Sequence, residues 1–280
     1  MTKKISFQGN LGAYSDLACR HVYPEMETIP CTSFADAFDA VTSGTADLAM
    51  IPIDNLIAGR VADIHHLIPR SNLYIIGEYY LPVHHCLLAP AGTKLEQVKK
   101  VYSHIHALPQ CRDFIAEHKL EGIVFGDTAR SAQHVADMKD PQCAAIASSL
   151  AGDIYGLETI CKNIEDEKGN LTRFIILSPE HQVPEKEEGK KYITSLLFRV
   201  RSIPAALYKA LGGFATNGIN LTKLESYMVD GTFTAAQFYC DVEGHPEDRA
   251  LQLALEELGF FAEEIRNIGT YEMAHIPSED

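Results

Sequence analysis

The chain has 280 residues, of which 46% are hydrophobic, so it can bury the cores of two domains and falls outside the composition of disordered proteins. Its net charge of −14 argues against nucleic acid as a partner, because nucleic-acid binding needs a basic surface. An anionic small molecule is compatible with this charge if arginine side chains or helix N-termini attract it locally.

Neither the N-terminus nor the cysteines indicate an exported or membrane-bound protein. The first residues run directly into a strand-like segment without an apolar signal core, and no apolar stretch is long enough to span a bilayer. The seven cysteines are scattered and form no Cys-x-x-Cys pair, which argues against a disulfide framework and against structural zinc. We therefore expect a cytoplasmic protein with no metal site and no membrane partner.

Strands and helices alternate over residues 1–177. Short apolar runs predict strands at residues 4–7, 47–53, 101–102, 122–125 and 143–147. Helices are predicted at 15–22, after Ser33, at 109–118 and at 127–137. Such alternation predicts α/β sheets with helices on both faces, whose ligands bind beyond the carboxyl ends of the strands. Because polar clusters follow several of these strands, we predict two α/β lobes that face each other across a cleft.

A polar segment, residues 179–191, separates this region from a different pattern. It carries the charge run from Glu185 to Lys191 and is typical of a solvated linker. Over residues 192–280 the predicted order is strand, helix, strand, strand, helix, strand, with the third strand at 233–242. This βαββαβ order is that of the ferredoxin-like sandwich. Because such sheets have open edges, we expect the chain to form a homodimer or homotetramer.

The tetrapeptide Leu171-Thr172-Arg173-Phe174 places a hydroxyl donor beside a permanent cation, directly before an apolar run. That run predicts a buried strand, and polar groups at its mouth are costly unless a polar partner meets them. Arginine binds a carboxylate through two parallel hydrogen bonds, and threonine donates one proton to an oxygen. The pair therefore suits a small, anionic, oxygen-rich ligand, although alone it is better explained by a turn and a surface arginine.

The whole chain resembles the prephenate dehydratase family, in which a catalytic domain is followed by an ACT regulatory domain. The segments that carry the resemblance occur in the family's order: GNLGAYS at 9–15, IPIDNLIAG at 51–59, YSH at 102–104 with ALPQC at 107–111, DTA at 127–129, AAIAS at 144–148, NLTRF at 170–174 and, in the second domain, GINLTKLES at 218–226. The sequence departs from the family pattern at Leu56, where a serine is usual, and at Tyr227-Met228, where Arg-Pro is usual.

The resemblance implies a reaction and a domain plan. The reaction is the conversion of prephenate to phenylpyruvate with loss of water and carbon dioxide, a late step of phenylalanine synthesis that needs no metal or organic cofactor. The implied catalytic domain, residues 1–178, has two lobes similar to those of periplasmic binding proteins, with chain crossovers near residues 80 and 160. The implied ACT domain, residues 192–280, mediates feedback inhibition by L-phenylalanine.

The positions that match the family also imply the site residues. Thr172 is the expected donor to the leaving hydroxyl, and Arg173 is the expected ligand of a substrate carboxylate. Further substrate-binding residues are expected to be Asn10, Gly12, Ala13, Tyr14, Ser15, Asn55, Ser103, His104, Thr128 and Phe174. The expected L-phenylalanine pocket consists of Ala205, Ala206, Leu207, Asn217, Gly218, Ile219, Asn220, Leu221, Glu225 and Ser226.

Two alternatives stay open from the sequence. The first is arogenate dehydratase, because arogenate differs from prephenate only by an amine in place of the side-chain ketone. The second is a binding or sensor protein, because two-lobed α/β clefts also capture small molecules without chemistry. The adjacent Thr172 and Arg173 favour chemistry, although a pure binder can use both side chains.

Overall fold

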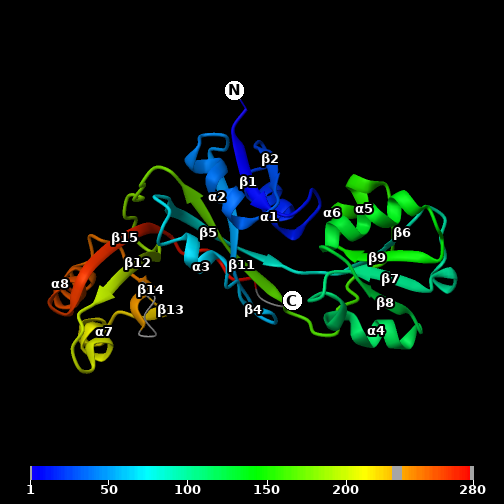
Figure 1. Cartoon of the computed structure of the whole chain (residues 1–280). Helices are drawn as coiled ribbons and strands as arrows, with labels where there is room; N and C mark the ends of the chain where they lie inside the picture. Colours follow the sequence, from blue (N-terminus) through cyan, green and yellow to red (C-terminus); the bar gives the residue numbers. More distant parts are fainter. Residues whose placement is uncertain (1, 229–234, 278–280) are drawn as a thin grey trace. The chain divides into compact units, whose positions relative to one another are not determined.

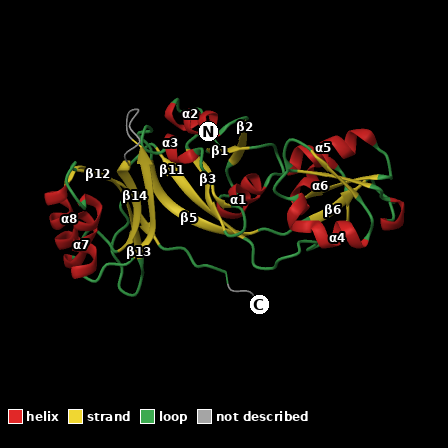
Figure 2. Ribbon diagram, turned by 60° about the horizontal axis from the view of Figure 1, so that its bottom comes forward, coloured by secondary structure: helices red, strands yellow, loops and turns green. Residues whose placement is uncertain are grey.

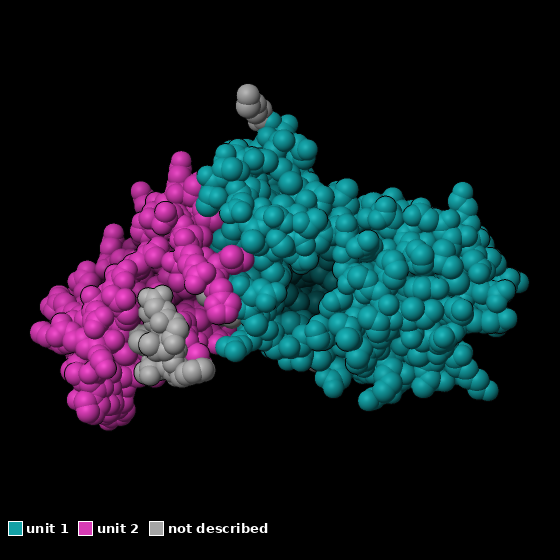
Figure 3. Space-filling view, viewed as in Figure 1, with its two compact units in different colours: residues 1–64, 79–174, 276–280 teal, residues 65–78, 175–275 magenta. Residues whose placement is uncertain are grey.

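The computed structural model describes residues 2–228 and 235–277, which divide into two compact units (Figures 1 and 3). Unit 1 comprises residues 1–64, 79–174 and 276–280, and unit 2 comprises residues 65–78 and 175–275. Strands β5 (Tyr74–Pro82) and β11 (Leu171–Ser178) each run from one unit into the other. The division therefore falls within two strands, whereas the sequence places the domain boundary after residue 178.

The first sheet is built around parallel strands. Its main path has the order β2-β1-β3-β11-β5, and β4 pairs with β3. β1 pairs in parallel with both β2 and β3, so the carboxyl ends of these strands lie at one edge of the sheet. The bounds of its other strands are β1 (Lys4–Gln8), β2 (Glu27–Cys31), β3 (Leu48–Asn55) and β4 (Gly59–Arg60).

The second sheet forms the other lobe and has the order β10-β6-β9-β7-β8. β7 is parallel to β8 and β9, whereas β6 is antiparallel to β9 and β10. Its strands are β6 (Cys86–Ala89), β7 (Lys100–Ser103), β8 (Glu121–Val124), β9 (Cys143–Ala147) and β10 (Glu158–Cys161). The chain passes between the two sheets over residues 83–85 and 162–170.

The central strand of this second sheet, β9, is buried on both faces. Ala145 and Ala147 pack with Ala132 of helix α5, whereas Ala144 and Ile146 belong to the cluster on the opposite face. Alternate side chains of a strand point to opposite faces, so the unbroken run of small apolar residues matches a sheet that is covered on both sides. The predicted two-lobed α/β architecture is confirmed.

Three helices of the two lobes begin after a side-chain cap, which is Ser33, Asp127 or Ser148. Ser33 accepts a hydrogen bond from the Asp36 amide (3.1 Å) and donates its own amide to the Asp36 carboxylate (3.0 Å), which completes a capping box. The helix expected at 109–118 is divided in two, because Cys111 leaves helical backbone geometry. The helical segments are α1 (Tyr14–Val22), α2 (Phe34–Thr42), α3 (Ile64–Leu67), η1 (Leu95–Gln97), η2 (Leu108–Cys111), α4 (Arg112–Glu117), α5 (Thr128–Met138) and α6 (Ser149–Tyr155).

Unit 2 contains an antiparallel sheet in the order β13-β14-β12-β15, with α7 (Ala206–Thr216) and α8 (Arg249–Phe261) against one face (Figure 2). Phe198, Phe214 and Leu251 belong to the core between these layers. The strands are β12 (Tyr192–Val200), β13 (Leu221–Met228), β14 (Ala235–Glu243) and β15 (Ala262–Glu272). This order confirms the predicted βαββαβ domain, although residues 233–234 of its expected third strand lie outside the described residues.

The edges of this sheet are β13 and β15, which leaves the expected homodimer or homotetramer as a prediction. Residues 179–191, the expected linker, contain neither helix nor strand. Within residues 2–228 and 235–277, we find no helix with the length and apolar character that a membrane crossing requires.

Helix α7 offers a matched pair of glycines for a test of its packing on α8. A Cβ added at Gly213 would lie 2.7 Å from Glu257 Cβ and 3.0 Å from Ala254 O, whereas one at Gly212 would meet nothing within 4 Å. Gly213→Ala should therefore destabilise the protein by about 1–3 kcal/mol through overpacking. Gly212→Ala should stabilise it by about 0.5–1 kcal/mol through helix propensity. Urea unfolding followed by circular dichroism measures both effects, and equal shifts would contradict the close approach.

Candidate active site

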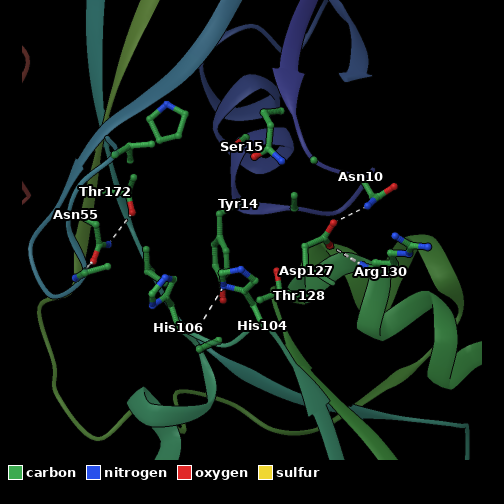
Figure 4. A pocket seen from close by; sticks show the side chains of 18 of the residues that line it. Asn10, Tyr14, Ser15, Asn55, His104, His106, Asp127, Thr128, Arg130 and Thr172 are labelled. Atoms are coloured by element: carbon green, nitrogen blue, oxygen red, sulfur yellow. Dashed lines mark hydrogen bonds between the residues drawn. The ribbon is translucent and has the colours of Figure 1, made fainter. Parts of the chain in front are cut away.

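A cleft of about 690 Å³ lies within unit 1, and residues from both lobes line it. The first lobe contributes the turn between β1 and α1 together with the ends of β3 and β11. The second lobe contributes the loop after β7 and the first turn of α5. Figure 4 shows Thr172 and Asn55 on one wall, and Asp127 and Arg130 on the other.

Most of the expected substrate-binding residues line this cleft. They are Asn10, Ala13, Tyr14, Ser15, Asn55, His104, Thr128, Thr172 and Phe174. Three other expected residues, Gly12, Ser103 and Arg173, are not among the residues that line it.

Arg173 is kept from the cleft by the alternation of side chains along β11. Thr172 and Phe174 both face the cleft, so the residue between them points to the other side of the strand. Arg173 is only 9% exposed and has interactions of its own. Its position argues against the direct contact with a substrate carboxylate that the sequence predicts.

Gly12 and Ser103 instead form hydrogen bonds with other residues of the protein. The Gly12 amide donates to Asp16 (2.8 Å), and the Gly12 carbonyl accepts from Ser148 (2.6 Å). Gly12 has a φ of +88°, and a Cβ there would lie 2.8 Å from Ala151 Cα, so only glycine fits. Ser103 is fully buried and donates to the Ile146 carbonyl (2.6 Å) across β7 and β9. The polar groups of both residues thus bond within the protein.

The side-chain amide of Asn55 fixes the direction of the hydrogen bond at Thr172. Asn55 Oδ1 accepts from the backbone amides of Ile57 (3.1 Å) and Ala58 (2.7 Å), which identifies it as the oxygen. Asn55 Nδ2 therefore donates, and one of its acceptors is Thr172 Oγ1 at 2.9 Å. Because Thr172 Oγ1 accepts this bond, the hydroxyl proton of Thr172 remains for an acceptor in the cleft.

Two further amides that line the cleft extend this network. Asn55 Nδ2 also donates to Asn170 Oδ1 (2.8 Å), and Asn170 Nδ2 donates to Gln110 Oε1 (2.9 Å). Gln110 Nε2 donates to the His106 carbonyl (2.8 Å), so Gln110 Oε1 can only accept. Every amide in the series thus has a fixed orientation, and the orientation of Thr172 does not depend on one bond alone.

The network ends at a buried histidine–tyrosine pair. His85 Nε2 lies 3.2 Å from Gln110 Oε1 and donates to it. The Tyr14 hydroxyl lies 2.7 Å from His85 Nδ1 and 2.9 Å from the His84 carbonyl, so its one proton has two acceptors. Burial lowers the pKa of His85, which favours the neutral imidazole. Burial also raises the pKa of Tyr14 well above its ordinary value, so Tyr14 stays a hydrogen-bond donor.

The opposite wall carries the charged groups of the cleft. Asp127 caps α5: Oδ1 accepts from the Arg130 amide (2.7 Å), and Oδ2 accepts from Asn10 Nδ2 (2.5 Å). Among the described residues that line the cleft, Asp127 is the only carboxylate and Arg130 is the only permanent cation. Burial and the neighbouring His106 lower the pKa of His104, and Asp127 opposes this effect only in part.

Several of these residues were not predicted from the sequence as site residues: His85, His106, Gln110, Asp127, Arg130 and Asn170. Gln110, Asp127 and Asn170 stand within the segments shared with the family, so a signal for them was present. Arg130 lies three residues after the start of a predicted helix, a spacing that returns it to the face of Asp127. His85 has no such signal. Among residues 2–228 and 235–277, no cluster of three His, Cys, Asp or Glu is arranged to hold a metal ion.

The expected L-phenylalanine residues lie in unit 2, before and within α7, in the α7–β13 turn and along β13. Ala205 and Gly218 have left-handed backbone conformations, with φ of +56° and +68°. Asn217 Nδ2 donates to Glu257 (3.0 Å), and Asn220 Nδ2 donates to Glu243 (3.0 Å). Ala206 lies in the domain core, and other members of the set pack against it: Leu207, Ile219 and Leu221. Glu225 pairs with Lys223, and Ser226 is an exposed residue of β13.

The family model of prephenate dehydratase matches residues 5–182. A bifunctional N-acyl-homoserine lactone acylase/prephenate dehydratase of Komagataeibacter europaeus is 47% identical over 269 residues, which is 95% of each chain. Arogenate dehydratase/prephenate dehydratase 1 of Arabidopsis thaliana is 39% identical over 284 residues, covering 96% of this chain and 72% of the relative.

Two solved structures resemble the fold over almost the whole chain. The quorum-quenching acylase GqqA superposes with a TM-score of 0.91 at 46% identity, covering 97% of this chain and 98% of that one. The prephenate dehydratase of Arthrobacter aurescens in complex with L-Phe superposes with a TM-score of 0.86 at 31% identity, covering 96% and 89%. From the family match and these identities, the chain is a member of the prephenate dehydratase family of carbon–oxygen lyases.

Proposed function

We propose that the cleft of unit 1 carries out the family's reaction, in which prephenate loses water and carbon dioxide to give phenylpyruvate, with Thr172 assisting the departure of the ring hydroxyl. The observation that carries this proposal is the hydrogen bond from Asn55 to Thr172, which leaves the Thr172 proton available to an acceptor in the cleft. A hydroxyl that can donate into a cleft suits a substrate whose leaving group is itself an oxygen.

The protein needs only to orient the substrate and to stabilise the leaving hydroxyl. The carbon–oxygen bond to the ring hydroxyl breaks while the ring carboxylate leaves as carbon dioxide, and the released electron pair completes the aromatic ring. Aromaticity supplies most of the driving force. Because a threonine hydroxyl is a poor acid, Thr172 stabilises the departing hydroxide through a hydrogen bond, and solvent supplies the proton that makes water.

The substrate's other groups have matching partners in the cleft. Phe174 lies on the same face of β11 as Thr172, where it offers an apolar contact to the ring. Since Arg173 points away, Arg130 is the permanent cation that remains to bind a carboxylate. The His104 imidazole lines the same side of the cleft, which belongs to the second lobe.

Replacement of Thr172 tests the proposal directly. Thr172→Val keeps the shape of the side chain and removes the hydroxyl, so kcat for phenylpyruvate formation should fall by about 10²–10³, the usual effect of deleting one donor to a developing charge. Thr172→Ser retains the hydroxyl and should keep most of the activity. Wild-type turnover by the valine variant would refute the assignment of Thr172.

A second variant tests the direction of the hydrogen bond. In Asn55→Asp the oxygen that accepts from Ile57 and Ala58 is kept, whereas the donor to Thr172 is lost. The Thr172 hydroxyl should then donate to the new carboxylate instead of the substrate, and kcat should fall by about 10², within the range for one lost donor. Combining it with Thr172→Val should add little further loss. Multiplying losses would show that the two residues act independently.

We also propose that L-phenylalanine binds unit 2 and inhibits the reaction. Two observations support this. The prephenate dehydratase of Arthrobacter aurescens, which is 31% identical to this chain, was solved in complex with L-Phe. Strand β11 also continues from Thr172 into the unit that contains the βαββαβ domain. A ligand that prefers one state of unit 2 shifts the population of the whole chain toward that state.

L-phenylalanine should therefore raise thermal stability and lower turnover together. At about 100 times its dissociation constant it should add about 2.7 kcal/mol to the free energy of unfolding, visible as a higher Tm. The Thr172→Val variant should show the same rise in Tm, because its change lies in the cleft and not in the effector site. D-phenylalanine is the control. Loss of the Tm rise in Thr172→Val would place the L-phenylalanine site in the cleft.

A further inference from the structure

Arg130 reaches the cleft with a long side chain that has many rotamers. It is an exposed residue in the first turn of α5, and among the described residues that line the cleft it is the permanent cation. No carboxylate of residues 2–228 or 235–277 forms an ion pair with it. A flexible side chain loses conformational freedom when it binds a ligand, and this loss weakens binding. The contribution of Arg130 to anion binding therefore depends on what holds its guanidinium before the anion arrives.

The ring of Phe125 supports the Arg130 side chain. The guanidinium carbon lies 6.0 Å from the centroid of this ring, a distance at which an aromatic ring attracts a cation. A Cβ added at Gly126 would lie 3.2 Å from Arg130 Cδ, so the stem of Arg130 crosses the backbone of Gly126. Gly126 lines the cleft, whereas Phe125 does not. The side chain of Arg130 therefore folds back over the two residues that precede Asp127, and its charged end contacts a ring outside the cleft lining.

The Phe125 ring is itself fixed by its neighbours. The His134 imidazole stacks on it, with 4.6 Å between the centroids and 15° between the planes, and Tyr102 meets it edge to face at 6.3 Å. The Phe125 amide donates to the Ser103 carbonyl (2.8 Å), which ties the residue to the end of β7. His134 follows Arg130 by four residues on α5, so both lie on the helix face that meets the ring. Arg130 thus lies against a fixed surface and not against another flexible side chain.

From this arrangement we infer that Phe125 is a positioning residue of the cleft: it holds the Arg130 guanidinium in place for a substrate carboxylate and so raises the affinity for prephenate. The inference rests on the proposed dehydratase function of the same cleft. A cation–π contact uses none of the guanidinium N–H groups, so these remain for two parallel hydrogen bonds to a carboxylate. An ion pair with a carboxylate of the protein would occupy the same groups. Support by a ring thus keeps positive charge available in a chain whose net charge is −14.

The test is the KM for prephenate in Phe125→Leu, which keeps an apolar side chain and removes the ring. KM should rise by about 3- to 10-fold, the usual effect of one more side chain that binding must order. The kcat should stay close to the wild-type value, because Phe125 does not contact the reacting groups. Phe125→Tyr keeps the ring and should keep the KM. In the background of Arg130→Met, which removes the charge, Phe125→Leu should raise KM no further, because a residue that acts only through Arg130 then has no effect.

Phe114→Leu is the matched control, because the Phe114 ring also packs on a histidine, His118, at 4.5 Å but does not line the cleft. It should leave KM unchanged, and thermal melts report whether each variant folds. An unchanged KM in Phe125→Leu overturns the inference, as does an equal rise in the background of Arg130→Met.

The dissociation constant of prephenate, measured by calorimetry, gives the same comparison without turnover. A wild type that binds prephenate but forms no phenylpyruvate refutes the proposed dehydratase function, and the dissociation constants of the variants still decide the role of Phe125. A wild type that does not bind prephenate overturns both.

Discussion

In the proposed mechanism, the chemistry of this cleft depends on the hydrogen bond from Asn55 to Thr172. A threonine hydroxyl both donates and accepts, and its proton can rotate, so position alone does not make it a donor to the substrate. Here the two backbone amides of Ile57 and Ala58 settle which atom of Asn55 is the oxygen, and that choice determines the role of Thr172. The loop after β3 therefore determines that Thr172 Oγ1, on β11, accepts a hydrogen bond from Asn55.

The side-chain amides of Asn170 and Gln110 extend this network across the two lobes. Asn170 lies on the segment that returns from the second lobe to the first, and Gln110 lies in η2 of the second lobe. Their orientations are set by donors and acceptors that cannot exchange roles, and the last of these is His85, which donates to Gln110. A change in how the lobes meet would disturb several of these bonds at once. The donor at Thr172 is thus sensitive to the arrangement of the whole cleft, although the residue sits on one strand.

More of the fold than of the site could be predicted from the sequence. Alternating apolar runs predicted both lobes and the βαββαβ domain, because periodicity and turn residues act locally. The sequence also predicted Thr172 and Asn55 as site residues, and both line the cleft. It grouped Arg173 with Thr172, although adjacent residues of a strand point to opposite sides and Arg173 does not line the cleft, so its role as a substrate ligand stays a prediction. Gly12 resembled part of an anion site, but its hydrogen bonds and its close contact with Ala151 exist only in the folded chain. Leu56, the departure from the family pattern, is exposed and does not line the cleft.

Because the chain has a net charge of −14, an anionic substrate must be held by local positive charge. Arg130 is the permanent cation among the described lining residues, and burial keeps the pKa of both His85 and His104 below the ordinary value. The cleft is therefore poor in positive charge. On the proposal that the substrate binds here, a dianion beside His104 would favour the protonated imidazole and raise its pKa, because opposite charges stabilise each other. Substrate binding and proton uptake at His104 would then reinforce each other.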